Sequence, residues 1–242
     1  MKKSIFYLMI LLCILCMSCS TENNDNENTD NIMYNRQIIE YLQHKYDVTA
    51  DVEFNSEYNK RMSKDDVEDF ESYFRFLGNL KKHPLQLKMS KYDHLTRARE
   101  TKSFSQTFDY EGNDVAVYVY YDVDETGRMA SPVSVVVGMG GHGESFYFRN
   151  AIYEVIDFGA SYNVNSTSIN VEKVRADYIV RNYNIINGKH GDTVMSIAKT
   201  KLAAYGYVNV LNHTGNFQLM YCGSGSWRQT IIDEELKKEI EP

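Results

Sequence analysis

The chain is poor in cysteine, and this limits how the protein can be stabilised. Its 242 residues include four Cys, and three of them (Cys13, Cys16 and Cys19) lie close to the N-terminus. Cys222 is the only other one, so no disulfide can join two cysteines within the body of the chain. Stability must therefore come from a hydrophobic core, which residues 34–242 are numerous enough to build.

The chain also lacks a basic excess, a membrane-length apolar run and metal-like histidine spacing. With 33 acidic and 26 basic residues its formal charge is -7, which argues against nucleic acid as a partner. The apolar run from Ile5 to Met17 is shorter than the roughly 20 residues that cross a bilayer. The six His show no ligand spacing, so we expect neither a metal site nor a cofactor. Hydrophobic residues make up 43% and charged residues 24%, which excludes a wholly disordered, collagen-like or polytopic membrane chain.

The first residues have the pattern of an export signal. Lys2 and Lys3 precede the apolar run, and Ser18 is a small residue directly before Cys19. Residues 1–18 resemble a bacterial lipoprotein signal peptide, although Cys16 stands where that family usually has Leu. The resemblance implies that Cys19 is lipidated, becomes the mature N-terminus and anchors the protein in the outer membrane. The alternative is an ordinary cleaved signal with Cys19 unmodified.

The next segment is acidic and has little to bury. Residues 19–33 contain four acidic residues and no basic residue, so we expect a solvated, disordered tether. The acids directly behind Cys19 resemble the surface-export signal of Bacteroidetes lipoproteins, which implies a place on the cell surface. A plain spacer on a protein that faces the periplasm is the alternative.

The body opens with helical patterns over 34–103. Residues 34–46 have helical apolar spacing, and Ser63 with Asp66 resembles a capping box at the start of a second helix that His83-Pro84 ends. Its predicted apolar stripe is Val67, Phe70, Phe74, Leu77 and Leu80. The basic segment 81–102 is expected to be a solvated face or loop. An anionic glycan, lipid headgroups or a protein partner would be its alternative contacts.

From Phe104 onward apolar and polar residues alternate. VAVYVYY (115–121) and VSVVVG (133–138) predict two strands joined by a hairpin loop, and residues 151–164 and 167–185 continue the pattern. A short helix is expected over 231–240, beginning after Thr230 and docking through Ile232, Leu236 and Ile240. The prediction is one α+β, mostly β domain over 34–242, with N-terminal helices followed by an antiparallel β-sandwich or barrel-like sheet at 104–242. The 19 Tyr are expected mainly in its strands and core.

Three short motifs resemble functional loops without completing them. GMGGHG (138–143) has dinucleotide-loop spacing, but no helical pattern follows, so a turn is expected. DVDETG (122–127) begins like a calcium loop, but Val133 replaces the bidentate Glu, which favours a hairpin turn. YCGSGSW (221–227) places Ser226 where papain-like proteases have their Cys. No catalytic constellation emerges, so the sequence leaves open whether the protein is an enzyme.

One longer resemblance concerns glycan binding. GDTVMSIAK (191–199) resembles the start of a LysM module, a βααβ unit that binds N-acetylglucosamine glycans, and the similarity extends over 183–230. It implies glycan contacts through the start of the first helix and the last loop, at Gly191, Asp192, Thr193, Val194, Met220 and Tyr221. The same letters also permit strands over 192–205. Asp192-Thr193-Val194 additionally resembles an O-glycosylation acceptor, whose glycan would obstruct that groove.

These observations lead to one functional expectation and two alternatives. We expect an outer-membrane lipoprotein of a non-enzymatic binding or envelope-accessory type, which recognises glycan or peptidoglycan. The alternatives are a glycan-directed hydrolase, whose carboxylates the sequence cannot pair, and a structural subunit of a surface assembly with protein partners.

Overall fold

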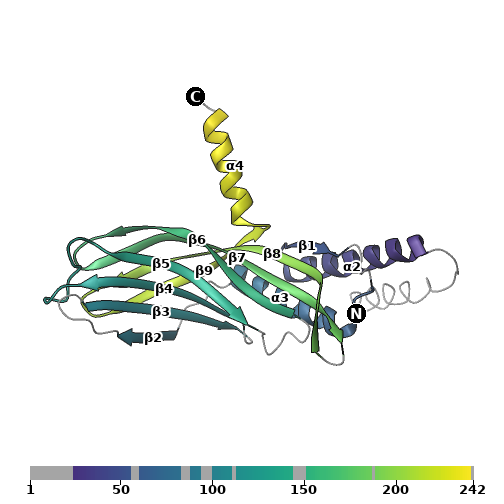
Figure 1. Ribbon diagram of the computed structural model, residues 1–242, viewed down its shortest axis with the longest axis horizontal. Helices are drawn as coiled ribbons and strands as arrows, with labels where there is room; N and C mark the ends of the chain where they lie inside the picture. The colour runs from purple at the N-terminus through teal and green to yellow at the C-terminus, as the bar shows by residue number, and fades with distance from the viewer. Residues whose placement is uncertain are drawn as a thin grey trace, which may run out of the picture.

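Helices come first and last in the chain, and strands occupy the middle. The computed structural model describes residues 24–55, 60–82, 88–93, 100–110, 113–143, 151–186 and 189–240. The described helices are α2 (Asn24–Tyr46), α3 (Lys64–Lys82) and α4 (Trp227–Ile240). The described strands are β1 (Asp51–Phe54), β2 (Lys88–Asp93), β3 (Glu100–Tyr110), β4 (Asn113–Val123), β5 (Val135–Gly143), β6 (Ala151–Val164), β7 (Ser168–Ile186), β8 (Lys189–Asn209) and β9 (Thr214–Ser224). This arrangement confirms the predicted α+β, mostly β class (Figure 1).

Helix α2 begins at Asn24, well before the predicted start at residue 34. The prediction of a disordered tether is therefore wrong for residues 24–33, while 19–23 lie outside the described residues. A contact from elsewhere in the chain holds this extension, because Arg61 Nε donates a hydrogen bond to Asn31 Oδ1 at 3.2 Å. Once a helix has a packed nucleus, each further residue adds one hydrogen bond at small cost. No helix in the described part of the chain has the length and apolar content needed to cross a membrane.

Helix α3 confirms the second predicted helix and its capping box. The Ser63 amide and hydroxyl donate to Asp66 Oδ2 at 2.8 and 2.7 Å, and the Asp66 amide donates back to Ser63 Oγ at 3.2 Å. The aromatic and aliphatic residues of its inner face are at most 3% exposed, namely Phe70, Tyr73, Phe74, Phe76, Leu77 and Leu80. The helix ends at Lys82, and the predicted terminator His83-Pro84 lies outside the described residues.

The described strands form one antiparallel sheet. Its order is β1-β8-β7-β6-β5-β4-β3-β2, and β9 also pairs with β8. Strand β1 pairs with residues 196–199 of β8 and β9 pairs with residues 200–209, so both lie along the same edge of β8. Residues 88–93 and 100–102 of the basic segment are strand, so the expectation of a loop is wrong there. Residues 83–87 and 94–99 of that segment lie outside the described residues.

Alternation along the strands sends one set of side chains inward. In β4 the inward residues are at most 2% exposed, namely Val115, Val117, Val119, Tyr121 and Val123, whereas Tyr120 is 46% exposed. The period of two that the sequence predicts for 115–121 is thus confirmed, and tyrosine occupies both faces.

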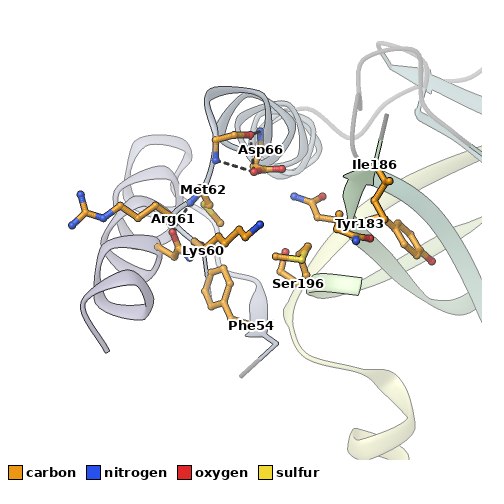
Figure 2. A pocket seen from close by; sticks show the side chains of 13 residues that line it. Phe54, Lys60, Arg61, Met62, Asp66, Tyr183, Ile186 and Ser196 are labelled. Carbon is orange, nitrogen blue, oxygen red and sulfur yellow. Dashed lines mark hydrogen bonds between the residues drawn. The ribbon is translucent and has the colours of Figure 1, made fainter. Parts of the chain in front are cut away.

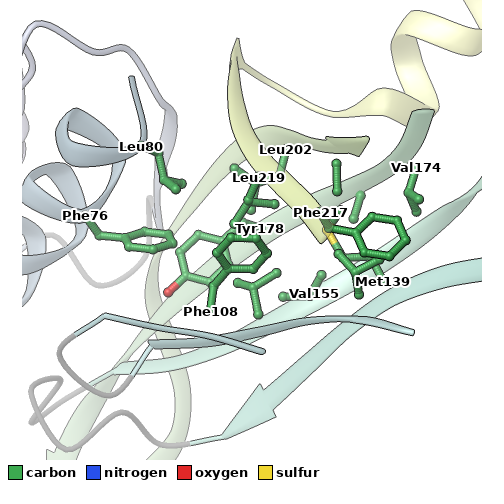
Figure 3. Packing of buried hydrophobic residues seen from close by; sticks show 14 of the residues in the cluster. Phe76, Leu80, Phe108, Met139, Val155, Val174, Tyr178, Leu202, Phe217 and Leu219 are labelled. Carbon is green, nitrogen blue, oxygen red and sulfur yellow. The ribbon is translucent and has the colours of Figure 1, made fainter. Parts of the chain in front are cut away.

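The sheet curls so that β3 approaches β9. The buried Gln106 accepts a hydrogen bond from the Phe217 amide at 2.7 Å, and the rings of Phe104 and Phe217 are 5.9 Å apart. Figure 3 shows the resulting core, with Phe76 and Leu80 of α3 beside Tyr178 and with Phe217 further along the sheet. The core thus lies between the curved sheet and α3.

The two glycine- and aspartate-rich motifs have different outcomes. GMGGHG belongs to β5, so the expected turn is wrong. Glycine suits this strand because a Cβ on Gly138 would come within 2.4 Å of the Tyr118 ring. DVDETG contains the predicted hairpin turn, in which Asp124 Oδ1 accepts hydrogen bonds from the backbone amides of Thr126 and Arg128.

Candidate functional site

The residues expected to form a LysM groove lie on strands. Strand β8 spans Lys189–Asn209 and contains all of 192–205, where the module needs its first helix. Inward positions of β8 are buried at every second residue, including Ser196, Ala198 and Thr200, as the pleat of a strand requires, and β8 is paired along its length with β7. Residues 183–230 therefore do not form a βααβ unit, and the LysM interpretation is wrong.

The four predicted residues on β8 sit near the β7–β8 hairpin end. Gly191 and Asp192 are the third and fourth residues of the strand. The Thr193 amide donates to Asn184 Oδ1 at 3.1 Å, and the Val194 carbonyl accepts from Asn55 Nδ2 at 3.0 Å. These polar contacts fasten β7, β8 and the segment after β1 to one another.

The other two predicted residues lie elsewhere. Met220 pairs with Ala203 and Tyr221 with Leu202, which is about 26 Å along the strand from Val194 at ~3.3 Å per residue. The Tyr221 hydroxyl is held by the backbone of Thr49, with distances of 2.8 Å to its amide and 2.7 Å to its carbonyl. The six residues therefore share no site.

The outer face of β7, β8 and β9 carries a shallow depression. Its volume is about 370 Å³. Six of its lining side chains are aromatic, amide or carboxylate, and we call them the tyrosine face: Asn170, Glu172, Tyr205, Tyr207, Asn216 and Gln218. Tyr205 is 37% exposed and Tyr207 is 52% exposed, so both rings are available from solvent.

Strand register explains why amides flank the rings. Tyr207 lies opposite Asn170 on β7 and Asn216 on β9, and Tyr205 lies opposite Gln218, whose amide oxygen accepts its hydroxyl. Directly opposite residues share one face of an antiparallel sheet. The result is a row of two rings with hydrogen-bonding groups on both sides.

A β-bulge brings charged residues to the same place. The β7–β8 register shifts between Val171 and Val174, so that Glu172 and Lys173 together oppose Tyr205. Glu172 accepts a hydrogen bond from the side-chain Nδ2 of Asn163 on β6. The bulge thus adds one acidic and one basic side chain next to the tyrosine face.

Three cations gather beside the tyrosine face around Trp227. Lys173, Arg175 and Lys201, which we call the basic cluster, lie 4.6, 5.4 and 5.5 Å from the centroid of the indole ring. Such distances allow cation–π attraction. Trp227 is 7% exposed, and its Nε1 donates to the Leu202 carbonyl at 2.7 Å, so the ring is a fixed support for these cations.

Trp227 also starts helix α4, four residues before the predicted start at Ile231. The Trp227 amide donates to Asp177 Oδ1 at 2.7 Å, and the Ser226 hydroxyl donates to the same carboxylate. Burial raises the pKa of Asp177, while these two hydrogen bonds oppose the shift. Ile232 is 40% exposed, so the predicted docking face is wrong there, and the side chains of Leu236 and Ile240 lie outside the described ones. Figure 1 shows α4 standing away from the sheet beyond its base.

Sequence reasoning did not single out the tyrosine face. Its signal is the alternating Tyr205-Gly206-Tyr207 segment on a strand whose neighbours carry amides, and those neighbours are known only from the register. In the described residues, no group of three His, Cys, Asp or Glu side chains is placed to hold a metal ion.

Comparison with known proteins adds no relative. No protein-family model, no curated protein and no solved structure matches the chain.

Proposed function

We propose that the protein is a membrane-anchored lipoprotein that binds an acidic glycan at the tyrosine face. The observation that carries this proposal is the pair of exposed rings, Tyr205 and Tyr207, with amides on both sides and the basic cluster adjacent. A tyrosine ring offers an apolar surface to the C–H face of a sugar and a hydroxyl to its polar edge.

The amides and cations supply specificity in different ways. Asn and Gln side chains both donate and accept hydrogen bonds, which suits the hydroxyl groups of a sugar. The basic cluster favours a ligand that carries carboxylate, phosphate or sulfate groups.

The anchor belongs to the same proposal. Cys19 carries the lipid, and the protein sits in the outer membrane with its body on the cell surface or, in the alternative, facing the periplasm. This part rests on the signal-like residues 1–18 and on the acidic residues behind Cys19.

The test is retention on immobilised glycans, including peptidoglycan and one matched pair. Polygalacturonate and its methyl ester have the same backbone and differ in charge, so the proposal expects stronger binding of the unesterified polymer, weakened by salt. Replacing both Tyr205 and Tyr207 by Ala should weaken binding by about 5- to 150-fold, since each aromatic contact contributes roughly 0.5–1.5 kcal/mol. Tyr120→Ala, on β4 and 46% exposed, is the matched control. Absence of binding to every glycan would refute the proposal.

The hydrolase alternative has its own readout. Among the lining residues of the tyrosine face, Glu172 is the one carboxylate, whereas most glycosidases use two. Release of reducing sugar ends from a bound glycan, abolished by Glu172→Gln, would replace the binding proposal with that alternative.

A further inference from the structure

A second depression lies at the opposite end of strands β7 and β8 from the tyrosine face. It has a volume of about 360 Å³ and is enclosed by α2, the segment 60–63, the start of α3, the end of β1 and the ends of β7 and β8. Figure 2 shows side chains from the helices and from the strands converging on it. It shares no lining residue with the tyrosine face. We call it the hairpin pocket.

Two buried polar side chains face the hairpin pocket and have no hydrogen-bond partner among the described residues. Asn182 on β7 and Ser196 on β8 are opposite each other in the register and are 3% and 4% exposed. Both line the pocket, and neither side chain makes a hydrogen bond with any described residue. Buried polar groups almost always have a partner in the protein, in water or in a ligand, so these two groups point to an occupant.

A second asparagine in the same pocket, Asn35, provides a comparison because its side-chain amide is hydrogen-bonded to the protein. Asn35 is also 3% exposed, but its Nδ2 donates to the Lys60 carbonyl at 2.9 Å and its Oδ1 accepts from the Met62 amide at 2.8 Å. Asn35 therefore holds the segment before α3 in place. Asn182 matches it in residue type and burial and differs in having no such contact.

Charge at the mouth of the pocket indicates what kind of polar group fits. The Lys60 side chain reaches into the space between helices and strands, whereas Arg61 points away (Figure 2). Arg61 lies over the Tyr34 ring at 5.0 Å. The Asp66 carboxylate accepts hydrogen bonds from the amide and hydroxyl of Ser63 through Oδ2. Lys60 is thus the cation placed to meet a ligand.

We infer that the hairpin pocket binds a small monocarboxylate with a short apolar chain. Its carboxylate accepts hydrogen bonds from the Asn182 amide, the Ser196 hydroxyl and the Lys60 ammonium, because all three are donors and charge-assisted bonds are the strong ones. Its chain packs against the apolar lining side chains Phe54, Met62 and Met195. This inference is independent of the glycan proposal, since the two sites share no residue.

The binding test uses hexanoate as the probe and hexanamide as its neutral analogue, measured by calorimetry on the full-length protein in detergent. We expect saturable binding of hexanoate, with hexanamide at least tenfold weaker. Asn182→Leu should weaken hexanoate binding at least tenfold, and Lys60→Gln about threefold. Lys64→Gln is the matched charge control, because the Lys64 side chain is 88% exposed and does not line the pocket. Absence of hexanoate binding, or equal binding by Asn182→Leu, overturns the inference.

A stability measurement tests the same inference without any ligand. Replacing an unpartnered buried amide by an apolar side chain of similar size is close to neutral, whereas removing a satisfied one leaves its partners unpaired. Asn182→Leu should therefore leave the thermal midpoint unchanged or raise it, and Asn35→Leu should lower it by several degrees. An equal loss in both variants would mean that Asn182 is structural, and would overturn the inference.

Discussion

The hydroxyl groups of Tyr73 and Thr200 lie 2.8 Å apart in the core and join helix α3 to strand β8. Both residues are fully buried, and the Tyr73 ring stacks on Tyr178 of β7 with centroids 5.7 Å apart. Burial raises the pKa of Tyr73, so its hydroxyl stays neutral at every ordinary pH. One polar contact inside an apolar cluster therefore fixes how the helix sits on the sheet.

Tyr73→Phe should lower the free energy of unfolding by about 1 kcal/mol, the usual net value of a buried hydrogen bond. The loss stays small because the Thr200 hydroxyl also donates to the Tyr178 carbonyl, at 3.3 Å. Urea denaturation measures it, with Tyr207→Phe on the exposed face as the control. A loss above about 3 kcal/mol would indicate that Thr200 is left unpaired.

Gly206→Ala should destabilise the protein by at least about 2 kcal/mol, because an added methyl group has no room between β8 and β9. A Cβ at this position would lie 2.1 Å from the Asn216 carbonyl oxygen. This oxygen belongs to the backbone, so it cannot move aside by a change of side-chain rotamer. Gly140→Ala is the matched control, since its nearest neighbour is 3.6 Å away in Tyr118. Equal stability of the two variants in urea would contradict the close approach of the strands.

Asp177→Asn should change how stability depends on pH. Burial raises the pKa of Asp177 in the folded protein, so folding favours the protonated form. Relative to the Asn variant, the wild type should be most stable below the unfolded pKa of the group and should lose that advantage as pH rises through the folded pKa. Thermal midpoints across an acidic pH series measure the difference.

Asp124→Asn provides a control of opposite sign. Hydrogen bonds from Thr126 and Arg128 lower the pKa of Asp124, so its stabilisation is present above the unfolded pKa and disappears as pH falls through the folded pKa. Parallel pH profiles for the two variants would show that the environment of Asp177 is wrongly described.

Mass spectrometry of the mature N-terminus tests the lipid on Cys19 directly.

A lipidated Cys19 leaves Cys222 as the one free thiol of the mature chain. This thiol should react slowly with a disulfide reagent in the native protein and quickly in urea. The reason is that burial raises the pKa of Cys222, although the neighbouring Lys173 and Lys201 oppose the shift. A Cys222 that reacts rapidly in the native protein would contradict its burial, and an unmodified Cys19 would contradict the lipid anchor.

The sequence predicts correctly those features that depend only on residues close together in the chain. The Ser63–Asp66 capping box and the alternation of β4 are both contained in short windows, and both predictions are confirmed. Helix α4 was placed too late because its cap, Asp177, lies 50 residues before Trp227.

The sequence could not decide residues 192–205, because Ala198 and Leu202 fit a helical stripe as well as an inward strand face. Pairing with β7 makes residues 192–205 a strand and not a helix. That pairing depends on residues distant in the sequence, so a short window cannot reveal it. The same holds for Asn182 and Ser196, which the register brings together across two strands. Both candidate sites were therefore missed for one reason, since they are made by strand pairing and not by a contiguous motif.

The early start of α2 has a consequence for how the protein stands on a membrane. With a lipid on Cys19, the five residue steps to Asn24 span at most about 18 Å, so the body cannot drift far from the bilayer. Helix α2 is 23 residues long, or roughly 35 Å, and forms a rigid element. Figure 1 places the start of this helix at the opposite end of the molecule from the β8–β9 turn, next to which Tyr207 lies. If Cys19 carries the lipid, this geometry allows Tyr207 to lie at the end of the molecule that is farthest from the bilayer.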